Sequence, residues 1–66
     1  MTNNLRVLRA MVNISQAQLA DEIAVSRQTI NAMEKGKYVP STVLALKLAA
    51  YFKKPVEEIF ALEPGD

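Results

Sequence analysis

Two helix-start signals follow each other closely in the middle of this chain, and they constrain its fold more than any other feature. Ser15 begins the pattern Ser-x-x-Gln, in which the serine hydroxyl caps the amide of Gln18 and the Gln18 side chain bonds back. Ser26 begins a second helix, and apolar residues at 14 and 19, and at 25 and 30, form a hydrophobic staple around each start. The first helix must therefore end by Ala24, which leaves a short turn between two helices.

The other segments also have helical periodicity. Apolar residues recur at three and four positions, β-branched runs are few, and no Asn-Gly or Asp-Gly turn is present. We therefore predict an all-α fold of five helices, over residues 3 or 4 to 12, 15–24, 27–35, 41–52 and a short segment after Pro55, with Asn13 and Gly36 as left-handed helix ends. The predicted core consists of Leu5, Leu8, Val12, Leu19, Ala20, Ile23, Ile30, Met33, Leu44, Ala45, Leu48, Phe52, Val56 and Ile59.

The side chains present exclude the usual catalytic and metal-binding groups. The 66 residues include no Cys and no His, so there is no disulfide framework, zinc finger or thiol nucleophile. Asp21-Glu22 and Glu57-Glu58 are adjacent pairs whose carboxylates do not face each other, and no glycine-rich loop is available for phosphate. We expect no enzyme activity, no cofactor, no metal and no small-molecule substrate. A core this small also favours completion by a partner subunit.

Neither a secretion signal nor a membrane anchor is predicted. The N-terminus has no continuous apolar stretch, and the mostly apolar segment 43–52 is interrupted by Lys47 and is far shorter than the ~20 residues that span a bilayer. We expect a soluble, cytoplasmic protein without membrane contact.

Charge is divided unevenly along the chain. Residues 1–54 contain all 8 basic side chains and 3 of the 7 acids, whereas residues 55–66 contain 4 acids and no base. The lysines between Lys35 and Lys54 are not interrupted by any acid, so this part of the chain can present a positive face to a polyanion. Charge alone favours the simpler interpretation, an ordinary solvated helix surface.

The two capped helices form a pattern typical of helix-turn-helix proteins. The second of them, Arg27 to Lys35, has a polar, weakly charged outer face that suits the major groove of double-stranded DNA. Arg27 matches the two acceptors of guanine, and Gln28 matches the acceptor and donor of adenine. The alternative is that Arg27 and Gln28 are merely exposed residues of a first helical turn.

Four segments together indicate a family. They are Ser15-Gln16-x-x-Leu19-Ala20, Val25-Ser26-Arg27-Gln28-Thr29-Ile30-Asn31-x-x-Glu34-x-Gly36, Pro40-Ser41, and Val56-Glu57-Glu58-Ile59-Phe60. From about residue 5 to residue 60 the chain resembles the Cro and phage-repressor type, or XRE-like, helix-turn-helix family. The resemblance implies a compact five-helix, lambda-repressor-like DNA-binding domain at residues 1–62, with a short tail at 63–66 and the helix-turn-helix in the second and third helices. It also implies a transcriptional regulator without a cofactor, in our interpretation a repressor that binds a palindromic operator as a homodimer.

The resemblance also assigns roles to individual residues. It implies base reading by Arg27, Gln28, Asn31 and Ala32, although Ala32 can only touch a thymine methyl group or permit close approach. It implies phosphate contacts by Gln16, Thr29, Lys35, Lys37 and Tyr38, and a structural ion pair between Arg9 and Glu34. For Gln16 the alternative is an idle surface amide.

The chain departs from the family pattern at Asn13, Ala24 and Lys53, where glycine is common. Each position lies near a helix end where left-handed backbone is expected. Asparagine tolerates that conformation. At Ala24 and Lys53 a positive φ is unfavourable by roughly 1 kcal/mol or more, unless these turns have a different geometry.

Two questions of partnership stay open. Val56, Phe60 and Leu62 form a candidate apolar dimer interface, although Phe60 is nearly as well explained as a core residue. The same fold also occurs in antitoxins, which bind a toxin as a protein partner, and in controllers of restriction-modification systems. Apolar residues at Met11, Val43 and Tyr51 favour a protein-interaction module, and the few residues after Phe60 oppose it.

Overall fold

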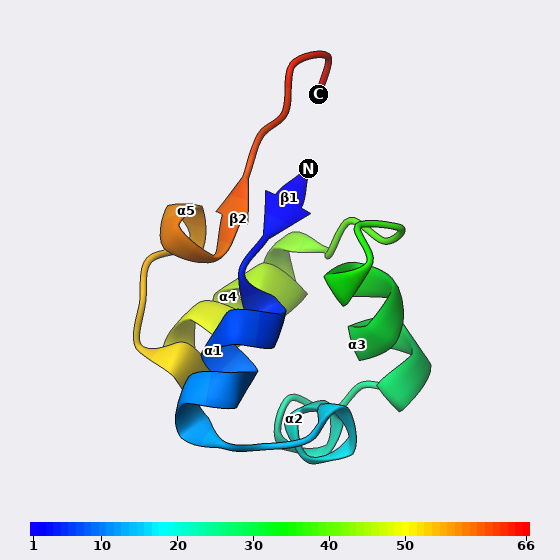
Figure 1. Ribbon diagram of the computed structural model, residues 1–66, viewed down its shortest axis with the longest axis vertical. Helices are drawn as coiled ribbons and strands as arrows, with labels where there is room; N and C mark the ends of the chain where they lie inside the picture. The colour runs from blue at the N-terminus through cyan, green and yellow to red at the C-terminus, as the bar shows by residue number, and fades with distance from the viewer.

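The five predicted helices are present in the computed structural model, which describes residues 1–66 (Figure 1). The longest helix has 11 residues, and none has the length and apolar character needed to cross a membrane. The two chain ends meet at one end of the molecule, beside the last helix, while the second helix lies at the opposite end (Figure 1). The elements are β1 (Thr2–Asn3), α1 (Leu5–Val12), α2 (Gln16–Glu22), α3 (Arg27–Glu34), α4 (Thr42–Phe52), α5 (Val56–Ile59) and β2 (Phe60–Ala61).

A small antiparallel sheet corrects the all-α prediction. β1 pairs with β2, with Thr2 opposite Ala61 and Asn3 opposite Phe60. Asn4 extends this junction, since its amide donates to the Ile59 carbonyl at 2.9 Å. Strands of two residues are too short to show an alternating pattern, so the sequence contained no signal for them. Because Asn3 belongs to β1, α1 begins later than its earliest predicted start.

Three serines begin helices in the predicted way. The hydroxyls of Ser15, Ser26 and Ser41 accept hydrogen bonds from the amides three residues later at 3.0, 3.1 and 3.1 Å. The Gln18 side chain also accepts from the Ser15 amide, which completes the capping box. Because Ser15 and Ser26 fix where α2 and α3 begin, they also fix the turn between the two helices.

The end of α3 is closed by Gly36, as predicted. Gly36 has φ of 73° and donates its amide to the Met33 carbonyl at 2.9 Å, while the Lys37 amide donates to the Ala32 carbonyl at 2.9 Å. These two bonds form a Schellman motif. The helix ends at Glu34, and Lys35 is its cap rather than its last residue. The chain after α3 is thereby directed sharply away from the helix axis.

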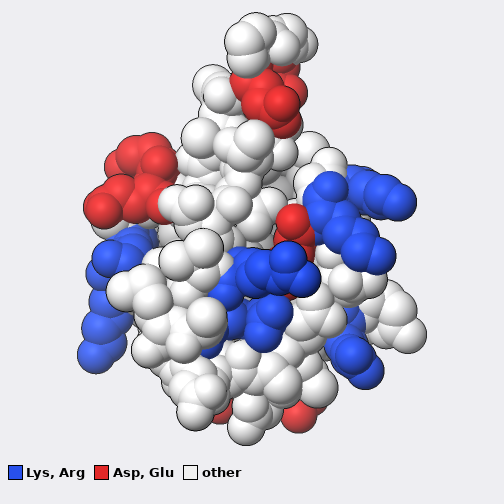
Figure 2. All heavy atoms as spheres, in the orientation of Figure 1, with Lys and Arg blue, Asp and Glu red and all other residues white.

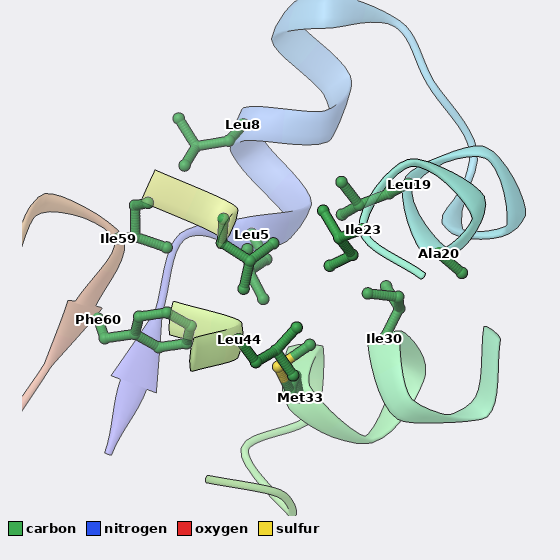
Figure 3. Close-up of a cluster of buried hydrophobic side chains, with 11 residues drawn as sticks. Leu5, Leu8, Leu19, Ala20, Ile23, Ile30, Met33, Leu44, Ile59 and Phe60 are labelled. Atoms are coloured by element: carbon green, nitrogen blue, oxygen red, sulfur yellow. The ribbon is translucent and has the colours of Figure 1, made fainter. Parts of the chain in front are cut away.

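The core is a single cluster to which every helix contributes. Figure 3 shows side chains of α1, α2, α3, α4, the end of α5 and β2 gathered into this one cluster. Val12 was predicted to belong to this core, but it is 52% exposed because it closes α1 where the chain turns toward α2. Ala45, Phe52 and Val56 are only partly buried. The buried residues are Leu5, Leu8, Leu19, Ala20, Ile23, Ile30, Met33, Leu44, Leu48, Ile59 and Phe60.

The last four residues fold back on the N-terminus. The Met1 ammonium lies 2.9 Å from Glu63 Oε1 and 3.0 Å from Asp66 Oδ2. Hydrogen bonds to Glu63 and then Asp66 raise the pKa of this amine. The antiparallel pairing of β1 with β2 brings Met1 to the start of the tail, so the contact follows from the sheet.

Asn13, Ala24 and Lys53 all have left-handed backbone, with φ of 57°, 59° and 56°. Ala24 is exposed, so its side chain contributes little burial to offset this strain. We therefore predict that Ala24→Gly raises the free energy of unfolding by about 0.5–1 kcal/mol, because glycine adopts positive φ without a steric penalty. Urea unfolding measures this change.

Ala17→Gly is the matched control for Ala24→Gly. Ala17 is also exposed but has helical backbone in the first turn of α2, where glycine lowers the free energy of unfolding by up to about 1 kcal/mol. Equal destabilisation by both substitutions would show that Ala24 is not strained.

Candidate nucleic-acid interface

The N-terminus of α2 and the exposed side of α3 enclose a polar hollow. Its volume is about 260 Å³, and all four residues that line it, Gln16, Arg27, Gln28 and Asn31, are polar. Each was predicted to contact DNA, three at bases and one at phosphate. The fold therefore brings together residues from two helices whose starts are fixed by Ser15 and Ser26.

The predicted base-reading residues differ in how far they reach out. Arg27 and Gln28, in the first turn of α3, are exposed to solvent, so their polar groups are available to a ligand. Asn31 is half-buried, one turn further along. Ala32 is also half-buried and is not part of the hollow. The first turn of α3 thus carries the most accessible polar groups.

Two of the predicted phosphate-binding side chains already have partners within the protein. The Thr29 hydroxyl lies 2.9 Å from that of Ser26, and the Thr29 amide bonds to the same serine. The Gln16 amide nitrogen donates to Asn31 Oδ1 at 3.3 Å and to Glu34 Oε1 at 3.1 Å. Both side chains are therefore less free than the sequence suggested.

Lys35, Lys37 and Tyr38 follow α3 and are all exposed. The Schellman motif holds the start of this segment, so two ammonium groups are placed just beyond the end of the helix. On the face shown in Figure 2, basic side chains spread over the helical body, whereas acidic groups gather mainly at the end that carries α5 and the tail. A polyanion approaching α3 thus meets a positive edge.

The ion pair implied by the resemblance is present beneath this surface. Arg9 donates from Nε and Nη2 to the two carboxylate oxygens of Glu34, and from Nη1 to the Ile14 carbonyl at 3.0 Å. The side chains of Arg9 and Glu34 are only 15% and 6% exposed. The pair therefore connects α1, the turn that precedes α2 and the last residue of α3.

The pKa of Glu34 is lower than its ordinary value. Burial acts in the opposite direction and is the largest single influence, but hydrogen bonds from Arg9 and Gln16, with attraction by Arg9 and Arg6, outweigh it. Hydrogen bonding to Glu34 likewise raises the pKa of Arg9. Both groups are charged at neutral pH.

Sequence reasoning missed two polar connections that support α3. Asn3 Nδ2 donates to the Met33 carbonyl at 2.7 Å, which ties β1 to the end of α3. The bonds of Gln16 to Asn31 and Glu34 were also missed. Neither had a local signal, because the partners lie 30, 15 and 18 positions apart in the chain. The structure brings together no group of acidic side chains that would hold a metal ion.

Comparison with known proteins identifies the family of this chain. The helix-turn-helix family model matches residues 5–59, and the chain belongs to this XRE-like family, as the sequence resemblance indicated. An uncharacterized HTH-type transcriptional regulator of Methanocaldococcus jannaschii is 51% identical over 66 residues, the whole of both chains. YgzD of Bacillus subtilis, with the same description, is 46% identical over 63 residues and 96% of each chain. A third such regulator, from Archaeoglobus fulgidus, is 41% identical over 96% of this chain and 89% of its own.

The lowered pKa of Glu34 predicts a pH dependence of stability. A carboxyl whose pKa is lower in the folded state stabilises the fold above its unfolded pKa, and this contribution disappears as the pH falls through the folded value. We expect Glu34→Gln to lower the free energy of unfolding by about 1–3 kcal/mol at pH 7, because Arg9 is left partly buried without its counter-charge. The loss should shrink below pH 4.5, the ordinary pKa of this carboxyl. Urea unfolding from pH 3 to pH 7 measures it.

Asp66→Asn is the control for this titration. The pKa of Asp66 is also lowered, by the Glu63 backbone amide and then by the Met1 ammonium, but its carboxylate lies in the tail rather than between helices. The Glu34 contribution should persist in this variant. If Glu34→Gln unfolds with the same pH dependence as the wild type, the ion pair does not stabilise the fold.

Proposed function

We propose that this protein is a sequence-specific regulator of transcription that binds double-stranded DNA, with α2 and α3 as its helix-turn-helix. The polar hollow that contains Gln16, Arg27, Gln28 and Asn31 carries the proposal. An α-helix fits a major groove about 12 Å wide, and in that position the first turn of α3 lies nearest the bases. The description of the relatives as HTH-type transcriptional regulators supports the same function.

Base recognition is proposed for the exposed side of α3. Arg27 donates two hydrogen bonds to the N7 and O6 acceptors of guanine, and Gln28 pairs with the N6 and N7 atoms of adenine. Asn31 lies one turn deeper, toward α2. Ala32 offers only a methyl group, so its contribution is contact with a thymine methyl. These side chains select sequence by hydrogen-bond geometry rather than by charge.

Phosphate binding is proposed for the two margins of this surface. Lys35, Lys37 and Tyr38 lie beyond the end of α3, and their exposed polar groups suit the backbone of one strand. The first backbone amides of α2, at Gln16 and the next residue, suit the other, because amides at a helix start favour anions. The Thr29 hydroxyl is a further candidate. Such contacts fix register without selecting bases.

We further propose that two copies bind a palindromic operator and repress transcription by occupying it. Leu62 is 81% exposed and Val56 is half-buried, so this end of the chain leaves an apolar surface for a second copy. Phe60 is only 7% exposed and belongs to the core, so its part in an interface is small. A two-fold dimer would place two α3 helices one DNA turn, about 34 Å, apart.

A protein partner is the alternative function. Met11 and Val43 are 70% and 64% exposed, and Val7, one turn before Met11, is 58% exposed. Apolar side chains on an exposed helix surface suit a protein ligand such as a toxin, as in antitoxins of this fold. Tyr51, by contrast, is partly buried against the core. The DNA experiment below separates the two functions.

The first experiment measures fluorescence anisotropy on pooled random duplex across a salt series, followed by selection from the pool. We expect the double variant Arg27→Ala, Gln28→Ala to lose sequence enrichment while it keeps most of the salt dependence, because base contacts select sequence and phosphate contacts release counterions. The matched double variant Lys35→Ala, Lys37→Ala should keep its sequence preference while its log-log salt slope falls by about two. Absence of binding by the wild type at low salt would favour the protein partner instead.

Sedimentation velocity tests the dimer. The wild type should sediment as a dimer at micromolar concentration, and Leu62→Asp should give a folded monomer, because Leu62 is outside the core and its loss removes only the stability that dimerisation adds. Val12→Asp is the control, since Val12 is also exposed but is the last residue of α1 rather than part of the segment after α5. A wild type that stays monomeric would contradict the proposal.

A further inference from the structure

Four side chains form one continuous line of hydrogen bonds from the interior to the polar hollow. Arg9 donates to both carboxylate oxygens of Glu34. Gln16 Nε2 donates to Glu34 Oε1 at 3.1 Å and to Asn31 Oδ1 at 3.3 Å. Asn31 and Gln16 line the hollow, whereas Glu34 is almost completely covered. The line therefore links a buried charge to the surface proposed to read DNA.

The chemistry of the groups fixes the direction of every bond in this line. A guanidinium has only donors, and an ionised carboxylate has only acceptors. Gln16 must therefore turn its NH₂ group, and not its oxygen, toward Glu34. The same NH₂ group also donates to Asn31, which therefore presents its oxygen. Each step leaves one orientation, because reversing Gln16 would place two acceptors against each other and reversing Asn31 would place two donors against each other.

We propose that Gln16 is a positioning residue that fixes the side-chain amide of Asn31 with its oxygen toward α2 and its NH₂ group free for DNA. This inference rests on the proposed function and deepens it. Asn31 Nδ2 makes no hydrogen bond within the protein. Since no buried polar side-chain atom lacks a partner, this NH₂ group is not buried and is accessible to a ligand. An unconstrained asparagine can rotate its amide to match either a donor or an acceptor, whereas the amide of Asn31 is held in one orientation.

The fixed orientation of the Asn31 amide determines which base atoms it can bind. An NH₂ group bonds to the acceptors of the major groove, which are N7 of either purine, O6 of guanine and O4 of thymine. It does not bond to the N4 amino group of cytosine. At the base pair that Asn31 faces, the protein should therefore favour a base that presents an acceptor to it and discriminate against cytosine.

The same bonds change the role of Gln16 itself. Its NH₂ group already donates to two oxygens of the protein, so the side chain presents its oxygen to a ligand. A phosphate accepts hydrogen bonds and does not donate them at neutral pH. The Gln16 side chain therefore acts through Asn31 rather than by donating to a phosphate.

Hydrogen exchange of side-chain amides tests the orientation without DNA. NMR should find the Gln16 NH₂ hydrogens protected from exchange with solvent, relative to the Asn31 and Gln28 NH₂ hydrogens. Gln28 is an internal reference because it is exposed on the same surface. Protection of Asn31 with free exchange at Gln16 would mean that the bond runs the other way, and equal exchange would mean that there is no fixed orientation. Either result overturns the inference.

Selection from random duplex tests the consequence. Gln16→Met has a similar length but no donor, so we expect its preference to fall by about tenfold at one base pair, the same one affected by Asn31→Ala. Gln16→Lys restores a donor toward both oxygens and should keep that preference. Arg27 is intact in all three variants, so enrichment at its own base pair should continue and show that each protein is folded.

The outcomes separate this inference from the function on which it rests. If the wild type enriches sequences but Gln16→Met changes nothing, or changes a base pair other than the one lost in Asn31→Ala, Gln16 does not orient Asn31 for reading. If the wild type enriches no sequence at all, the proposed function fails, and the role of Gln16 at DNA fails with it. The exchange pattern then still decides whether the four side chains form the fixed line.

Discussion

The ion pair between Arg9 and Glu34 connects three helices whose relative placement decides what the surface of α3 can contact. Arg9 holds the last residue of α3 with two donors and the turn before α2 with a third, and Glu34 also accepts a hydrogen bond from Gln16 of α2. A buried pair of this kind is not an efficient source of stability, because desolvation of both charges offsets much of their attraction. Its geometry is specific, however, since a guanidinium meets a carboxylate in one plane. The pair thus contributes more to the orientation of α3 than to the free energy of folding.

Stability comes mainly from the apolar cluster, which is small for five helices. Eleven buried residues form it, and Leu5, Leu19, Ile30, Met33, Leu48 and Ile59 are almost completely enclosed. With so few contacts, the strain accepted at Ala24 and Lys53 is a significant fraction of a marginal total. Short turns with left-handed residues keep the helices close enough to share this core. The unfavourable backbone conformation at these turns is therefore offset by the packing of the helices against one another.

Local signals made most of the fold predictable from sequence. Ser15, Ser26 and Gly36 act on amides or carbonyls within a few residues, so their patterns are visible without a structure. The first-turn position of Arg27 and Gln28 followed directly from Ser26. The sheet was not predictable, because it joins residues 2–3 to residues 60–61 through strands too short for any periodicity. Val12 was assigned to the core because spacing along a helix does not reveal where neighbouring helices stop covering it.

The candidate site shows the same limit. The pair of Arg9 and Glu34 was expected from the family resemblance, but the attachment of Gln16 to it required the structure, since it depends on how α2 crosses α3. That hydrogen bond determines which donors and acceptors the surface presents. A sequence lists amides at 16 and 31 as groups able to donate or accept, whereas a neighbouring buried charge removes this freedom from both. In the proposed function, specificity at this surface depends on a residue that does not contact the ligand, because the Glu34 carboxylate beneath α3 determines which end of an amide faces outward.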